Sequence, residues 1–543
     1  MAFNLLRSEQ NKPRAIALMA AMMLGLAACS GGATSTGSEG AASEGSEMAS
    51  EGTTESAEAT KGGEIRAASA YDLSGSIDPA TTSAAVTLAG NWHVMEGLVE
   101  LDRVTGEPYA ALAKELPKVD GNTFEVDLRE GAKFSDGTDV KADDVVFSYN
   151  RVLENKEGFY DDFISFIEKV EPVDDDTIKF TMSSPFSLID ERLSVVKIVP
   201  KALVEKDAEA YGQLPVGSGP WKYVSATPND KIVYAPNENY NGPKPASAET
   251  MTWDLLSDPA ARVTALLDET VSAIENVPAN DKESIENQGF KVESVDSFGL
   301  AFLMFNTKKA PWDKVEARQA LFYALDIPTL IDDYLGGDAN PVKSFLNEKH
   351  PNFHEAKNVY TYDVNKAKEL LSQAGVQEGQ EVTLRIADSW IKPMAPAIQQ
   401  QLEAVGLKVN LKEMPSKALY PEIDSGDNDI VIAPGDPSVF GSDPDLLMRW
   451  WYGKNVWSET RYAWADNPEF EKLQGLLDEA AKLEGDAQQQ KWNEAFDLLS
   501  EQVPLYPIMH RKVPTAYNEN VLQNFKPVST TGLSFIDVSV KQQ

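Results

Sequence analysis

Cysteine is almost absent from this chain of 543 residues, because Cys29 is its only one. An intramolecular disulfide is therefore excluded, as are a catalytic thiol and a cysteine metal cluster in the rest of the chain. Histidine is also scarce, and the four are His93, His350, His354 and His510. Only His350 and His354 are four residues apart, and Pro351 between them disfavours a shared helical face. HExxH, CxxC and Walker-type motifs are missing too, so we predict no catalytic residue, metal or other cofactor.

Long apolar runs are missing as well. The uncharged stretch from Ala15 to Leu26 has 12 residues. As a helix it would be about 18 Å long, too short for a hydrocarbon core of about 30 Å. It follows three basic residues and ends at small ones, which is typical of a secretory signal. No later apolar run reaches the length of a membrane span, so no transmembrane helix is expected.

The signal ends in Leu26-Ala27-Ala28-Cys29, which resembles a lipobox, where the cysteine is acylated and becomes the mature N-terminus. We therefore expect residues 1–28 to be a lipoprotein signal peptide. Residues 29–60 are almost entirely Gly, Ala, Ser, Thr and Glu, and we expect a disordered acidic linker there. The sequence thus predicts an extracytoplasmic protein, anchored to the outer face of the cell membrane by lipidated Cys29.

Composition limits what the remaining residues can be. The chain carries a net charge of −36, which disfavours nucleic acid and anionic headgroups as partners. Ten tryptophans and a hydrophobic content of 42% indicate a folded protein. Residues 61–543 exceed what one hydrophobic core usually supports, so two or three lobes are expected.

Strand patterns alternate with amphipathic helix patterns along these residues, which predicts an α/β fold. The expected strands are Glu64–Ala68, Thr123–Leu128, Thr177–Thr181, Lys231–Tyr234, Thr252–Leu256, Leu300–Phe305, Val382–Ile386 and Lys408–Leu411. The expected helices are Ala142–Leu153, Asp258–Leu267, Val315–Leu325, Asn365–Gln373, Ala395–Val405 and Ala487–Ser500.

Six ordered segments resemble those of the extracytoplasmic solute-binding proteins of family 5, the dipeptide, oligopeptide and nickel binders of ABC importers. They are MEGLV at 95–99, FEVDLREGAKFSDGTDVKADDVVFS at 124–148, VGSGPW at 216–221, FNTKKAPWDKVEARQALFYALD at 305–326, YDVNKAKELLSQAG at 362–375 and VPLYP at 503–507. The order of these segments, more than any one of them, carries the resemblance. It covers roughly residues 64–540.

The resemblance implies a type II periplasmic-binding-protein-like fold, with two α/β lobes, hinge strands and an inserted extra domain. Lobe I would take residues 61–107, 216–304 and 506–543. The inserted domain II would take residues 108–215, and lobe III residues 305–505. Such a protein would be a monomer that closes on its solute and delivers it to the permease subunits of an ABC importer in the membrane.

Two local features of these segments have structural interpretations. The family usually has Ser or Thr where this chain has Lys141, so Asp139 or the aspartates Asp143 and Asp144 must compensate for the missing hydroxyl cap. Arg318 lies within a predicted helix and is expected at the surface, paired with a carboxylate.

Ligand contacts are expected from less regular segments, above all from residues 430–464. These combine rigid aromatic side chains with aspartates in Gly-Asp-Pro and Ser-Asp-Pro turns, which suits a pocket for an amphipathic solute. The candidates there are Asp436, Phe440, Asp443, Trp450, Trp451, Trp457 and Trp464. Trp390, Tyr71 and Trp92 are further candidates. The alternative is that about half of these aromatic residues pack the core of their own lobe.

In peptide-binding members of the family, an aspartate in a "GD…DP" segment pairs with the α-amino group of the ligand. Asp436 and Asp443 resemble its two halves, but the halves are further apart here, so either can hold that role. A peptide ligand is favoured, and an oligosaccharide is the alternative because tryptophan stacks on sugar rings. A different kind of protein, a secreted lipid-anchored hydrolase with a carboxylate pair, would need two acids with displaced pKa values in one cleft.

Overall fold

The computed structural model describes residues 62–155 and 160–541. Cys29, the signal peptide and the linker up to residue 60 lie outside the described residues, so their expected roles stay predictions. Among the described residues, no helix is long and apolar enough to cross a bilayer.

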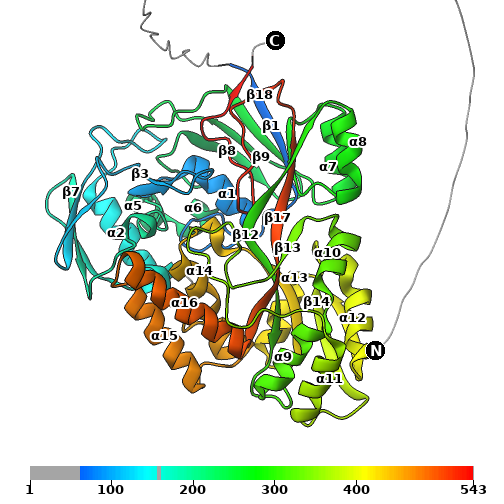
Figure 1. Cartoon of the computed structure of the whole chain (residues 1–543). Coiled ribbons are helices and arrows are strands. Elements are labelled where there is room, and N and C mark those ends of the chain that lie inside the picture. The colour runs from blue at the N-terminus through cyan, green and yellow to red at the C-terminus, as the bar shows by residue number, and fades with distance from the viewer. Residues whose placement is uncertain (1–61, 156–159, 542–543) are drawn as a thin grey trace, which may run out of the picture. The chain divides into compact units, whose positions relative to one another are not determined.

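Most strands belong to one eleven-stranded mixed sheet (Figure 1). Its path runs β15-β14-β16-β12-β17-β11-β1-β10-β9-β8, with β13 paired to β17. The strands are β1 (Glu64–Ser69), β8 (Trp221–Thr227), β9 (Lys231–Pro236), β10 (Thr250–Leu255), β11 (Ala273–Glu275), β12 (Lys291–Phe305), β13 (Ala339–Pro341), β14 (Gln380–Ala387), β15 (Leu407–Met414), β16 (Ile430–Gly435) and β17 (Leu505–Tyr517).

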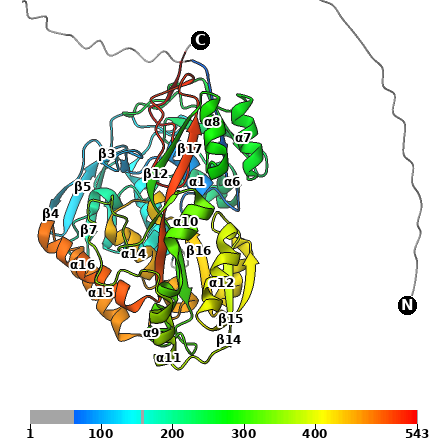
Figure 2. The same cartoon turned by 45° about the vertical axis from the view of Figure 1, so that its right-hand side comes forward.

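Strands β12 and β17 join two halves of this sheet. We name β1 and β8–β11 the first half and β14–β16 the second half. Residues Lys291–Asp296 of β12 pair with the end of β17 beside the first half, and Leu300–Met304 pair with its start beside the second. The register shifts between these two stretches, at Ser297–Gly299, which we call the β12 bulge. Figures 1 and 2 show the two strands side by side over this length.

A separate four-stranded antiparallel sheet lies within residues 118–182. Its order is β4 (Lys118–Asp120), β5 (Thr123–Asp127), β7 (Thr177–Met182) and β6 (Ile167–Pro172). Helix α2 (Ala142–Glu154) packs on it, with Tyr149 edge-on to Phe180 at 5.0 Å between ring centroids. This sheet falls within the range expected for the inserted domain, although the predicted lobe boundaries stay a prediction. Two small two-stranded antiparallel sheets pair β2 (Val99–Leu101) with β3 (Pro108–Ala110) and β18 (Leu522–Gln523) with β19 (Ser539–Val540).

Helices cover both halves of the large sheet. The longer ones are α1 (Ala85–Val94), α7 (Pro259–Leu267), α9 (Val315–Ala324), α10 (Ile327–Leu335), α11 (Val364–Gln373), α12 (Ala395–Ala404), α13 (Ser416–Asp424), α14 (Pro444–Tyr452), α15 (Pro468–Ala480) and α16 (Gly485–Gln502). The shorter ones are α3 (Tyr160–Phe163), α4 (Ile189–Arg192), α5 (Lys201–Lys206), α6 (Ala208–Gln213) and α8 (Lys282–Asn287).

All predicted strands and helices are present, but β12 begins at Lys291, well before the predicted start at Leu300. The expectation of irregular structure in residues 430–464 is wrong. This segment forms β16, the short helix η3 (Pro437–Val439), α14 and the π-helical turn η4 (Trp457–Arg461). Strand β16 is regular because it lies between β12 and β14, where its backbone groups pair on both sides.

Of the aspartates expected to compensate at Lys141, Asp144 does so, because its carboxylate accepts a hydrogen bond from the Lys141 amide at 3.0 Å. The surface position expected for Arg318 is wrong, because its side chain is buried. Its guanidinium donates to the Gln502 carbonyl at 2.6 and 3.0 Å and to the Trp312 carbonyl at 2.8 Å. Arg318 therefore ties α9 to the end of α16.

Replacing Arg318 with Ala should lower the free energy of unfolding by about 2–4 kcal/mol, because three buried carbonyl contacts lose their charged donor. Urea denaturation followed by circular dichroism would measure it. Lys366→Ala, at an exposed ion pair on α11, is the control and should change it by less than about 0.5 kcal/mol. Equal effects of the two variants would contradict the structural role.

His93 connects α1 to the C-terminal segment. Its Nδ1 lies 3.0 Å from the Ala89 carbonyl, and its Nε2 accepts from the Phe535 amide at 2.8 Å, so the ring is neutral with the proton on Nδ1. The indole of Trp253 packs against it, with 5.4 Å between ring centroids. Burial lowers the pKa of His93 to about 4, because a charged imidazolium would lose its hydration.

The unfolded chain binds a proton at His93 below about pH 6.5, whereas the folded protein does not until about pH 4. This residue should therefore destabilise the fold as pH falls from 6.5 to 4, by up to about 1.4 kcal/mol per pH unit. Urea denaturation at several pH values should show a flatter pH dependence for His93→Gln than for the unchanged protein. Parallel curves for the two proteins would refute it.

Candidate functional site

The β12 bulge brings several candidate residues together. The Ser297 hydroxyl donates to the Arg511 carbonyl of β17 at 2.8 Å and accepts from the Gly299 amide at 3.2 Å. The Asn347 side chain donates to the Ser297 carbonyl at 2.6 Å. A Cβ on Gly299 would lie 3.3 Å from Oδ2 of Asp436, so glycine lets this carboxylate approach the strand closely. The two halves of the sheet therefore meet in a dense set of hydrogen bonds where β12 passes β17 at the β12 bulge. We call this place the crossing.

Asp436 follows β16 and is half-buried at this crossing. Its Oδ2 accepts from the Thr531 amide at 2.8 Å and the Thr531 hydroxyl at 2.7 Å, and its Oδ1 accepts from the amide and hydroxyl of Ser438. All these donors are neutral, and no cation of the described residues lies within ion-pair distance. The site thus holds an oriented negative charge without a counter-ion, as recognition of an ammonium group requires.

Asp443 has a different environment. It caps α14 by accepting from the Leu446 amide at 2.8 Å, and its Oδ1 pairs with Arg192 of α4 at 2.8 Å. Arg192 also pairs with Asp445 at 2.8 Å, and Asp445 with Arg449 at 3.0 Å. An internal guanidinium thus neutralises Asp443, so Asp436 is the better placed of the two for a ligand amine. The amine role itself stays a prediction for both.

Three of the predicted tryptophans pack into the core. Trp451 and Trp457 lie against Phe302 of β12, with ring centroids 5.0 and 5.7 Å away. Trp451 also fills the space beside Gly435, where a Cβ would come within 2.3 Å of the indole. Trp464 packs on Phe470. These three indoles are no more than 3% exposed, which favours the core interpretation for them.

Phe440 and Trp450 instead face the inserted segment. The Phe440 ring lies 5.2 Å from Tyr160, 5.6 Å from Phe163 and 5.4 Å from Trp450. Phe440 also borders a small cavity with Trp92, beside which Arg103 stacks at 4.6 Å. Its space of about 20 Å³ suits a single water molecule. Phe440, Trp450 and Trp92 therefore form a group of candidates distinct from the residues that hold Asp436.

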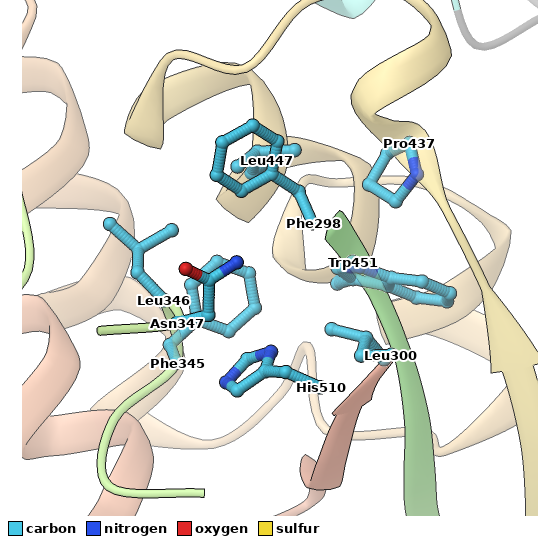
Figure 3. Close-up of a pocket in the computed structure, with 9 residues that line it drawn as sticks. All are labelled: Phe298, Leu300, Phe345, Leu346, Asn347, Pro437, Leu447, Trp451 and His510. Atoms are coloured by element: carbon cyan, nitrogen blue, oxygen red, sulfur yellow. The ribbon is translucent and has the colours of Figure 1, made fainter. Parts of the chain in front are cut away.

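A second small cavity adjoins the β12 bulge (Figure 3). Side chains from β12, β17, α14 and the loop at 345–347 converge on it, and its space is about 10 Å³. His510 lines it, and burial lowers the pKa of His510 to about 4. Neither this cavity nor the one at Phe440 is lined by a carboxylate, so neither offers the acid pair that a hydrolase would need. A wide depression of about 940 Å³ near Asp174–Asp176 is largely open.

Trp390 and Tyr71 meet through Arg511, which sequence reasoning missed. Tyr71 follows β1 in the first half and Trp390 follows β14 in the second. The Arg511 guanidinium stacks on the Trp390 ring at 5.1 Å and lies 3.4 Å from the Tyr71 hydroxyl. Strand β17 was not predicted because it contains prolines, and proline argues against a central strand. The position of Arg511 was therefore missed as well.

These features have counterparts in known proteins. The model of the bacterial extracellular solute-binding proteins, family 5, matches residues 107–459, and the chain belongs to this family. Di/tripeptide-binding protein 1 of Pseudomonas aeruginosa (strain UCBPP-PA14) is 25% identical, with 78% of this chain and 83% of that protein covered.

Two solved structures show the same fold. The Helicobacter pylori periplasmic binding protein DppA in complex with the peptide STSA has a TM-score of 0.78 at 22% identity, covering 89% of this chain and 99% of that one. AgaA of A. tumefaciens R10 in complex with agropinic acid has a TM-score of 0.78 at 27% identity, with the same coverage. The chain thus has the type II periplasmic-binding-protein fold, with two lobes and an extra domain, and its named relatives are binding proteins.

Asp443→Asn should lower the free energy of unfolding by about 2 kcal/mol, because Arg192 keeps only one of its two buried carboxylates. The matched control is Asp478→Asn, which removes the exposed partner of Arg449 in the same network and should cost less than about 0.5 kcal/mol. Urea denaturation measures both. If Asp443→Asn instead left stability unchanged and weakened ligand binding, Asp443 would be a ligand contact.

Proposed function

We propose that this protein is the lipid-anchored, extracytoplasmic substrate-binding component of an ABC importer. It captures peptides by lobe closure, leaves them chemically unchanged and delivers them to membrane permease subunits. Family membership supports extracytoplasmic binding, and the peptide-binding relatives support the ligand class. The proposal also includes lipid anchoring through Cys29 and action as a monomer.

The observation that carries this proposal is the pairing of β12 with β17 at the crossing. Among the described strands, only β12 and β17 join the two halves of the large sheet along its path, and their register shifts at the β12 bulge. Asp436, Tyr71 and Trp390 all adjoin this crossing. A solute that contacts both halves stabilises their closed arrangement by its differential affinity for it.

The cavity at the crossing is too small for a dipeptide, since its space is only about 10 Å³. Ligand entry therefore requires the halves to separate. In a peptide complex, Asp436 would accept the α-amino group, while Trp390 and Tyr71 would border the remainder of the chain. An oligosaccharide would rely on stacking instead, and Trp390 is the half-exposed indole at the crossing.

The full chain, purified in detergent, should bind peptides from a defined di- and tripeptide pool with micromolar or better affinity and return them intact. Mass spectrometry of material released by denaturation identifies them, and small-angle scattering should show compaction on binding. Asp436→Asn should weaken binding about tenfold or more by removing the charge opposite the ammonium. Hydrolysed peptides, or capture of neutral oligosaccharides alone, would overturn the proposal.

A further inference from the structure

Arg511 is a buried cation on β17, where that strand passes the β12 bulge. The residue is 7% exposed. Its partners among the described residues are all neutral: the Tyr71 hydroxyl at 3.4 Å, the Asn276 side-chain carbonyl and the Trp390 ring. No described carboxylate lies within ion-pair distance of it. A guanidinium carries five N–H donors, so these contacts leave much of its hydrogen-bonding capacity unused.

Other buried arginines of the described chain are better satisfied. Arg192 has two carboxylates, and Arg385 has Glu422. Arg318 and Arg262 lack an ion-paired carboxylate but donate three and four hydrogen bonds to backbone carbonyls. Arg511 is therefore distinguished by having a buried charge with neither a counter-ion nor a set of carbonyls.

Acidic neighbours do not correct this imbalance. Glu275 precedes Asn276, and one of its oxygens accepts from the Ser69 hydroxyl at 2.7 Å and from the Ala70 amide at 3.0 Å. The second cation nearby, Arg262, repels Arg511, and the field of Arg511 contributes to lowering the Arg262 pKa, of which burial is the main cause. Two carboxylates, Glu275 and Asp258, oppose this lowering of the Arg262 pKa, but neither forms an ion pair with Arg511.

Both halves of the sheet bury Arg511. Tyr71 and Asn276 follow β1 and β11 of the first half, whereas Trp390 follows β14 of the second. Separation of the halves would take the indole away and return the guanidinium to water. Closure without a counter-ion therefore costs free energy, because a desolvated charge is left unpaired.

We propose that Arg511 binds a carboxylate of the ligand and that this ion pair favours the closed form. The inference rests on the proposed function and adds that the cargo is anionic at the end opposite Asp436. A carboxylate matches the planar guanidinium in two parallel hydrogen bonds. In a peptide this group is the C-terminal carboxylate or an acidic side chain.

The test offers the full chain in detergent one pool of di- and tripeptides with free C-termini and the same pool amidated. Retention is measured by mass spectrometry, and affinity for the best retained peptide by calorimetry. The unchanged protein should prefer the free form by about 10- to 100-fold. Arg511→Gln should lose that preference while binding amidated peptides as before, and Arg511→Lys should restore part of it.

Arg461→Gln is the matched control, because Arg461 also stacks on aromatic rings but has Asp424 as its counter-ion. It should keep the full preference. Circular dichroism at rising temperature checks that both Gln variants fold. Retention of only those amidated peptides that carry Asp or Glu would assign the carboxylate to the side chain. Equal retention of both pools, or an unchanged preference in Arg511→Gln, would overturn the inference.

If no peptide binds, the proposed peptide function fails, and a pool of sugar acids and neutral oligosaccharides then tests Arg511 separately. Selective capture of the acids, lost in Arg511→Gln, would support the carboxylate site without the peptide function. Capture of neutral sugars alone, or of neither class, would overturn both.

Discussion

The antiparallel pairing of β12 with β17 is the interaction on which the rest of the molecule depends. Each strand carries one half of the large sheet along its outer edge, β16 on β12 and β11 on β17. The β12 bulge interrupts the ladder where the halves meet, and Ser297 restores contact there through its hydroxyl. Both strands run unbroken from one half of the sheet to the other, while the ladder between them is irregular at the bulge. A rigid sheet can bend at such an irregularity.

Charges around this crossing are unevenly distributed. Asp436 is held by neutral donors, Arg511 is held by neutral acceptors, and neither has an ion pair among the described residues. Asp443, in contrast, is neutralised from within. A zwitterionic solute would complement the first two and ignore the third. This division between satisfied and unsatisfied charges is the basis for proposing Asp436 and Arg511, and not Asp443, as ligand-binding residues.

Sequence patterns predicted much of this fold, because helices and most strands bury one periodic face. They failed for β17, whose Pro507 and Pro514 argue against a central strand, and for the polar start of β12. The candidate site was only partly predictable. Asp436, Trp390 and Tyr71 lie at the crossing, where their ligand roles stay predictions, whereas Trp451, Trp457 and Trp464 are buried in the core. No sequence pattern indicated Arg511, because whether a charge is paired depends on the residues that the fold brings next to it.

The ion pair of Arg192 with Asp443 and Asp445 ties α4 to α14 across 251 residues of chain. Losing Arg192 strands the Asp443 carboxylate away from water, and losing either aspartate leaves Arg192 with a single counter-ion. Divergence at these three positions is therefore coupled. A lineage can exchange the whole set for apolar side chains, or keep it intact, but intermediate sequences pass through a less stable protein.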